Sequence, residues 1–155
     1  MRAYMYNDQA TSEAHEKVPN EPVDLEALAR LGVLYWACDG PDGREKMEQI
    51  ARDRAYKNRD EVVISPDRLP NYEETLKIFF TEHIHEDEEI RFMLDGSGYF
   101  DVRDQNDRWI RLQVTAGDLI VLPAGIYHRF TLDNSNYIQV IRLFRDLPKW
   151  EAINR

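Results

Sequence analysis

Three of the chain's four histidines lie in its second half, at spacings that suit a metal ion. His83 and His85 are two residues apart, so both imidazoles face the same side if the segment is extended. Glu89 follows in "HIHEDEEIRF", and His128 lies on a separate segment, "LPAGIYHRF". Three imidazoles and one carboxylate suit Fe(II), Ni(II), Mn(II) or Zn(II) better than Ca(II), which prefers oxygen ligands alone. Six-coordinate geometry would leave two positions at which a substrate with two neighbouring oxygens can chelate the ion.

The competing interpretation is a histidine pair without a metal. An isolated His-x-His is more often a surface pair or a satisfied pair in a core than a ligand set. The combination with Glu89, with Gly96 beyond it, and with His128 behind a Pro-x-Gly turn favours a common ion. Some side chains of the right type are interpreted as loop charges or loop residues rather than ligands: His15, Glu86, Asp87 and Glu88.

The segments before the histidines mix helix and strand patterns. "VDLEALARLG" predicts a short helix with Asp24 as its N-cap and Gly32 as its stop, and "VLYWAC" predicts a strand after it. Residues 43–56 have the pattern of a surface helix. "EVVIS" predicts a strand that Pro66 ends, and "NYEETLKIFF" predicts a helix that leads into the histidine segment.

The second half consists of short β-prone runs separated by turn residues. "IRFMLDGSGYFDVRD" predicts a hairpin with a Gly-containing turn. "WIRLQV", "DLIVL", "IYHRFTL" and "YIQVIRLF" predict four further strands, enough for an antiparallel sandwich or small barrel that closes its edges. We therefore expect an α+β fold, mainly an antiparallel β-barrel or jelly roll, with a few short helices in the N-terminal half.

Size, charge and cysteine usage limit the class of protein. At 155 residues with 43% hydrophobic content, one domain is expected, with a mixed α/β portion at about 1–80 and a β-barrel core at about 81–147. The formal charge of −9 disfavours nucleic acid and anionic membrane surfaces as partners. Cys38 is the one cysteine, so a disulfide within the chain is excluded, which indicates a reducing compartment and disfavours a Cys-based zinc cluster. No stretch reaches the roughly 20 apolar residues of a membrane span, which predicts a soluble intracellular protein.

The histidine segments resemble the two metal motifs of the cupin superfamily. The first motif is matched by "HIHEDEE" and "GSG", and the second by "GDLIVLPAGIYH". The matching positions are His83, His85, Glu89 and Gly96, followed by Gly117, Pro123, Gly125 and His128. Lys77 and Leu132 depart from positions where the motifs often have Gly and Asn, but neither position belongs to the ligand set.

Within the cupins, the chain is similar to the acireductone dioxygenases of the methionine salvage pathway. The similarity runs through "EHIHEDEEIRFMLDGSGYFDVRD", "WIRL", "LPAGIYHRFTLD" and "IRLF", and "LEALARLGVLYW" extends it into the first half. It implies one Fe(II) or Ni(II) per chain, held by His83, His85, Glu89 and His128. The implied reaction joins O₂ with the acireductone 1,2-dihydroxy-3-keto-5-methylthiopentene. The iron form gives formate and 4-methylthio-2-oxobutanoate, and the nickel form gives formate, carbon monoxide and 3-methylthiopropanoate.

The resemblance also implies substrate contacts. Arg91 lies two residues after Glu89, on the same strand face, where its guanidinium can donate hydrogen bonds to a substrate oxygen as a catalytic group. The alternative is that Arg91 is a structural partner of a buried carboxylate, including Glu89 itself. Further positions that resemble substrate contacts are Phe79, Met93, Phe130 and Arg142, with ordinary core packing as the alternative for the apolar three and a role outside the contact shell for Arg142.

Two other functions fit the same fold. One is a cupin that binds a metal, a small ligand or a protein without catalysis, and the other is a cupin oxygenase or isomerase with another substrate. The dioxygenase interpretation implies acireductone and O₂ as partners, a monomer, and a cytoplasmic location to which a nuclear one can be added. The choice between Fe(II) and Ni(II) depends on metal availability as well as on ligand type, so the sequence leaves it open.

Overall fold

The computed structural model describes residues 1–10, 12–17, 19–145 and 153–155. The helices and strands of these residues follow one another in the order β1 (Arg2–Met5), α1 (Leu25–Arg30), β2 (Leu34–Ala37), α2 (Gly43–Asp53), β3 (Asn58–Ile64), α3 (Tyr72–Phe79), β4 (His83–Ile84), β5 (Glu89–Arg103), β6 (Trp109–Thr115), β7 (Asp118–Leu122), β8 (His128–Leu132), β9 (Ile138–Phe144) and β10 (Ile153–Asn154). The predicted α+β class with a mainly antiparallel β structure is confirmed. The expected core at 81–147 ends on two residues outside the described part.

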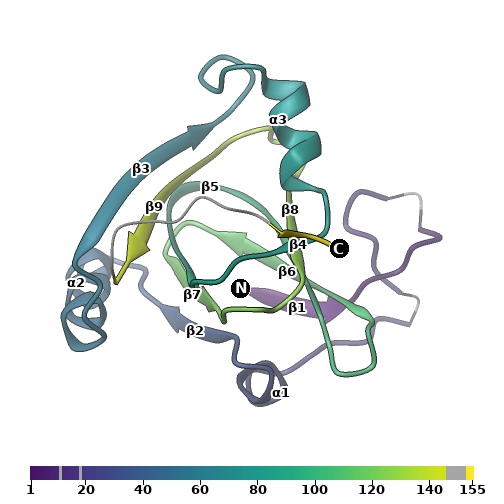
Figure 1. The fold of residues 1–155 in the computed structure, drawn as a ribbon, viewed down its shortest axis with the longest axis horizontal. Helices are drawn as coiled ribbons and strands as arrows, with labels where there is room; N and C mark the ends of the chain where they lie inside the picture. Colours follow the sequence, from purple (N-terminus) through teal and green to yellow (C-terminus); the bar gives the residue numbers. More distant parts are fainter. Residues whose placement is uncertain (11, 18, 146–152) are drawn as a thin grey trace.

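The strands form two antiparallel layers that share one strand (Figure 1). One layer has the order β1-β6-β5-β8-β4-β10, and in the other β5 lies between β7 and β9, which pair with β2 and β3. The expected closure of the barrel edges is wrong for the strands that the structure describes, because their order ends at β1 and β10. Strands β1, β2 and β3 come from the first half of the chain, and β1 was not expected from the sequence.

The predicted hairpin at "DGSG" is also wrong. Residues 89–103 form one continuous strand, β5. It pairs with β7 and β9 up to Gly96 and with β6 and β8 from Ser97 onward. The register with β9 shifts between Met93 and Asp95, and Gly96 has φ +78°, where an added Cβ would clash with the carbonyl oxygen of Tyr137, the residue before β9. The turn residues therefore make a bulge, which bends β5 from one layer into the other without reversing it.

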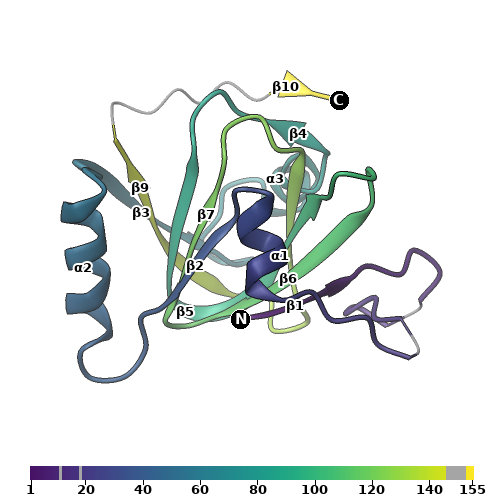
Figure 2. The same cartoon turned by 90° about the horizontal axis from the view of Figure 1, so that it is seen from below.

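The predicted helices are present with small differences in length. The Asp24 side chain caps α1 by accepting a hydrogen bond from the Ala27 N–H at 2.8 Å, and Gly32 has φ +88° just beyond the helix end. Helix α2 lies beside β3 and β9 in both overall views (Figures 1 and 2). Within the described residues, no helix combines the length and the apolar character that crossing a membrane requires.

Strand β7 is buried on both faces, and its neighbours β5 and β9 contribute buried residues to the same two sides. Ile90, Leu119 and Ile141 face an outer apolar cluster that includes Met47 and Ala51 of α2. The alternate residues face the interior between the layers, with Phe100 of β5 and others of the second layer. Two buried faces explain why "DLIVL" is a continuous apolar run and not an alternating one. Charged residues at inward positions of this layer therefore need a specific reason.

Candidate metal centre

Direct strand pairing brings the histidines together. His83 on β4 is the register partner of His128 on β8, and His85 follows β4 immediately. One ring nitrogen from each of these three histidines lies within 4.8 Å of the others. The ring centroids are 4.4 Å apart for His83 and His128, and 4.9 Å apart for His83 and His85. Residues 45 positions apart in the chain thus meet at one point.

Glu89 reaches the same point from the other layer, as the first residue of β5. Its Oε2 lies 2.5 Å from Nε2 of His128 and 3.9 Å from Nε2 of His85. Both Glu89 Oε2 and His128 Nε2 are buried, yet neither makes a hydrogen bond of normal geometry. Buried polar atoms without hydrogen bonds are costly in a protein interior, and a cation between them removes that cost.

The other ring nitrogens orient two of the histidines. Nδ1 of His83 lies 2.5 Å from the Thr81 carbonyl oxygen, and Nδ1 of His128 lies 2.9 Å from the Ile126 carbonyl oxygen. A carbonyl oxygen can only accept, so each Nδ1 carries the proton and donates it. Each Nε2 then presents its lone pair, which is how proteins commonly fix histidine ligands to a metal.

The charges in the cluster influence one another. Burial alone would raise the pKa of Glu89, but the Arg91 guanidinium and His128 hold this pKa well below its usual value. Burial alone would lower the pKa of His128, but the Glu89 carboxylate raises it. Burial lowers the pKa of His83, which keeps that imidazole neutral. The ionised Glu89 carboxylate thus favours positive charge beside it, and a divalent transition metal that replaces the proton on His128 would supply that charge.

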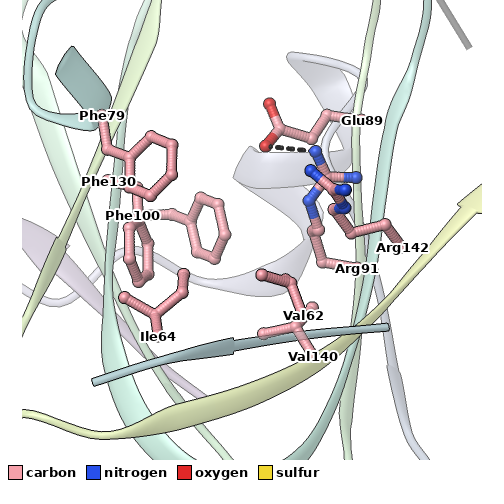
Figure 3. Close-up of a pocket in the computed structure, with 9 residues that line it drawn as sticks. All are labelled: Val62, Ile64, Phe79, Glu89, Arg91, Phe100, Phe130, Val140 and Arg142. Atoms are coloured by element: carbon pink, nitrogen blue, oxygen red, sulfur yellow. Dashed lines mark ion pairs between the residues drawn. The ribbon is translucent and has the colours of Figure 1, made fainter. Parts of the chain in front are cut away.

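A cavity adjoins this cluster through Glu89 (Figure 3). It has about 460 Å³ of empty space, including space open to solvent. Figure 3 shows its two chemically different sides, with phenylalanines facing Glu89 and two arginines. The lining residues come from five elements and are Val62, Ile64, Phe79, Glu89, Arg91, Phe100, Phe130, Val140 and Arg142.

The two arginines lie opposite each other on β5 and β9. Arg91 is the register partner of Arg142, and such like-charged neighbours repel each other. Glu89 compensates Arg91 with an ion pair of 3.0 Å, and Asp60 on β3 accepts two hydrogen bonds from Arg142, at 2.6 and 2.7 Å. Arg91 therefore makes the structural contact with Glu89 that the sequence left open, and it also lines the cavity. These positions stabilise negative charge at one side of the cavity.

Two of the three apolar residues predicted to contact the substrate line the cavity. Phe79 and Phe130 line the cavity, whereas Met93 is fully buried in the core and is not among the lining residues. Four further lining residues were not expected from the sequence: Val62, Ile64, Phe100 and Val140. Alternation from Arg91 does not find Phe100, because the bulge moves the inward positions from odd to even numbers. Cross-strand pairing with Phe130 would have found it, once the strand register was known.

The loop between His85 and Glu89 differs from expectation at one residue. Glu86 and Asp87 are exposed as predicted, but Glu88 is not a solvent-facing charge. Its side chain is 23% exposed and contacts Arg145 at 2.9 Å and Arg54 at 3.6 Å. These contacts fix the loop from its outer side, next to Glu89.

Comparisons with known proteins agree over nearly the whole chain. The family described as "ARD/ARD' family" matches residues 2–152. The chain is 52% identical to an acireductone dioxygenase of Branchiostoma floridae, over 98% of the chain and 86% of that protein. It is 52% identical to an acireductone dioxygenase of Rattus norvegicus, over 97% of the chain and 87% of that protein. A solved structure of the Bacillus anthracis acireductone dioxygenase, described with a cadmium ion in its active center, has the same fold. It gives a TM-score of 0.77 at 23% identity and covers 99% of this chain and 98% of that one.

Proposed function

The chain belongs to the ARD/ARD' family of acireductone dioxygenases, and on that premise we propose that it cleaves 1,2-dihydroxy-3-keto-5-methylthiopentene with O₂ in methionine salvage. The observation that carries the proposal is the convergence of three histidines and one carboxylate beside a cavity with one charged and one apolar side. This substrate has the same division, because its enediol end is acidic and its methylthio end is apolar.

The proposed ligands of the metal are His83, His85, Glu89 and His128. An Fe(II) or Ni(II) ion held there would supply Lewis-acid and redox chemistry to a chelating enediolate and O₂. Glu89 balances part of the positive charge, and the Nδ1 contacts of His83 and His128 keep their rings directed at the site. The cadmium ion named for the Bacillus anthracis relative supports a metal at the corresponding place.

Arg91 is the proposed catalytic contact of the substrate. Its guanidinium is buried at the cavity wall and is held by Glu89 at 3.0 Å, so it is already oriented before a substrate enters. A fixed N–H donor stabilises a developing oxyanion without reorganisation, and burial strengthens the interaction. Arg142 adds positive charge beside it, and Asp60 holds the Arg142 guanidinium in place. Together they bind and orient the anionic end.

The phenylalanine side of the cavity binds the methylthio end and excludes water from it. Phe79 and Phe130 are 6.2 Å apart in an edge-to-face arrangement, and Phe100 lies 4.9 Å from Phe130, measured between ring centroids. An apolar tail there gains about 0.8 kcal/mol for each buried CH₂ group. The tail also fixes which end of the substrate faces the arginines.

The test adds the reductone without oxygen to protein stripped of metal and reloaded with Fe(II) or Ni(II), and then admits O₂. We expect formate and 4-methylthio-2-oxobutanoate from the iron form, and formate, carbon monoxide and 3-methylthiopropanoate from the nickel form. Metal-free protein and free metal in buffer are the controls. A reductone that decays no faster with loaded protein than in these controls would overturn the proposal and leave a non-catalytic metal-binding protein.

The setting of the activity is proposed from composition. The formal charge of −9 gives no attraction to nucleic acid or anionic membranes, and the one cysteine gives no disulfide within the chain. We infer a monomer that works in the cytoplasm, with the nucleus as a second location. Sedimentation analysis of the loaded protein tests the monomer, and a stable dimer at micromolar concentration would contradict it.

A further inference from the structure

Gly98 lies on β5 directly behind the phenylalanine side of the cavity. A Cβ atom added there would lie 3.1 Å from Cε2 and 3.2 Å from Cζ of Phe130. It would also lie 3.2 Å from the carbonyl oxygen of Thr131, on the neighbouring strand β8. Such distances are shorter than ordinary carbon contacts, so a neighbour of the new methyl group would have to move.

The backbone of Gly98 does not require a glycine. Its φ lies outside the left-handed region, so any residue can adopt this conformation. Gly96, two positions earlier, is the opposite case. It has φ +78°, and a Cβ there would clash with the backbone of Tyr137 and Ile138. The fold thus needs Gly96 for its backbone shape, whereas Gly98 is needed for the space that it leaves to the Phe130 ring.

The direction in which that ring can yield follows from its surroundings. The Thr131 carbonyl belongs to the β5–β8 ladder, where Gly98 pairs with Leu132 and Phe100 with Phe130, so this backbone is fixed by hydrogen bonds. Phe100 packs against the ring at 4.9 Å between centroids. Phe79 lies edge-to-face with the ring at 6.2 Å between centroids, and the open side of the ring is the cavity, which Phe79 and Phe130 both line. A methyl group at residue 98 would push the ring into the cavity.

We infer that Gly98 determines how long an apolar substrate tail the cavity accepts, by letting the Phe130 ring lie against β5. This inference rests on the proposed function and adds to it a residue that selects the substrate class, reductones with a short thioether tail. The effect acts on the apolar side of the cavity, whereas Glu89 and Arg91 lie across from it (Figure 3). Tail selection is therefore separable from the contacts that Arg91 makes with the anionic end of the substrate.

The test compares three reductones that carry hydrogen, a methylthio group or a propylthio group at C5. Gly98→Ala should lower kcat/KM for the methylthio compound about tenfold relative to the hydrogen compound, since one methylene in an apolar pocket changes selectivity by at least this much. Phe130→Leu should shift the preference toward the propylthio compound. In the double variant, the smaller leucine makes room for the methyl group, so its selectivity should return toward that of the wild type.

The control is Val114→Ala. Val114 is the register partner of Gly98 on β6 and is fully buried, but it does not line the cavity, so its truncation weakens packing without changing the tail site. Its three kcat/KM values should keep the wild-type ratios. If Gly98→Ala does not fold, the double variant is compared with Phe130→Leu, because these two proteins differ at residue 98 alone. Unchanged ratios in the folded variants overturn the inference.

A crystal structure of Gly98→Ala gives a readout that does not depend on turnover. We expect the Phe130 ring to be displaced toward the cavity, and a ring that keeps its place overturns the inference. Wild-type protein that consumes none of the three reductones would instead overturn the proposed function. The two failures are therefore distinguishable.

Discussion

Strand β5 carries a cluster of buried charge on each side of its bulge, and the two clusters are built differently. Beyond the bulge, Asp101 is 1% exposed and accepts three hydrogen bonds at 2.7–2.9 Å, two from Arg111 and one from Arg129. The guanidiniums also stack on aromatic rings, with Arg111 4.4 Å from the ring centroid of Tyr99. Before the bulge, Glu89 and His128 bring buried ligand atoms together that make no hydrogen bond.

The difference separates a structural use of buried charge from a functional one. The carboxylates of Glu89 and Asp101 both lie on β5, and each forms an ion pair with an arginine. The oxygens of Asp101 are satisfied by the protein alone, so its cluster holds β5, β6 and β8 together. Glu89 Oε2 is left for a further positive group. Satisfaction of the carboxylate oxygens, more than their charge, therefore distinguishes the two clusters, although Nη2 of Arg129 in the Asp101 cluster is also buried without a hydrogen bond.

Among the changes that test the difference between the two clusters, Asp101→Ala should have the largest effect, a loss of unfolding free energy. The change leaves two buried guanidiniums without their carboxylate, and breaking a buried pair in this way costs about 3–5 kcal/mol of unfolding free energy. Urea denaturation measures the loss. Asp60→Ala is the matched control, since Asp60 is 41% exposed and its pair should contribute about 1 kcal/mol or less. Equal losses in the two variants would contradict the structural assignment.

His128→Gln should act on metal content before stability. Glutamine keeps most of the volume but removes the imidazole, so metal affinity and turnover should both fall by more than about 100-fold, beyond the loss typical of outer partners of a metal site. Elemental analysis and O₂ uptake measure the two quantities. His15→Gln is the control, because His15 stacks on Tyr6 away from the cluster and its loss should leave the metal in place. Full metal content in the His128 variant would remove it from the ligand set.

Arg91→Ala separates the two roles of its guanidinium. If it is the oxyanion donor, turnover falls by about 100-fold while metal content stays close to that of the wild type. Steady-state kinetics and elemental analysis on the same sample decide. A variant that unfolds or loses its metal would show that the pair with Glu89 is the main role of Arg91.

Glu88→Gln should give the smallest effect of these. The change weakens the contacts with Arg54 and Arg145 that fix the loop beside Glu89, so metal affinity should fall about tenfold, as for other residues that orient a ligand from outside. A competition titration with a chelator measures the affinity. Asp87→Asn removes an exposed charge from the same loop and should change nothing. Identical affinities in the two variants would show that the loop needs no anchor.

The sequence predicted those parts of the site that depend on near neighbours or on a recurring motif. His83, His85 and Glu89 are close in the chain, and the cap of α1 at Asp24 follows from local hydrogen bonding. The parts it missed depend on contacts between distant segments. "DGSG" has the residues of a turn, and only the strands on both sides of β5 make it a bulge. The sequence around Glu88 predicts a solvated charge, because its partners Arg54 and Arg145 lie 34 and 57 residues away.

The continuity of β5 also limits how the chain can be divided. A cut between Gly96 and Ser97 would split the strand that both layers need, leaving each fragment with unpaired backbone and an exposed apolar face. A cut between Gln105 and Asn106 falls in the exposed loop after β5 and keeps this strand whole. Two fragments cut between Gln105 and Asn106 should therefore assemble into the fold, and so should a circularly permuted chain whose ends lie there. The corresponding fragments and permuted chain with a break between Gly96 and Ser97 should not fold.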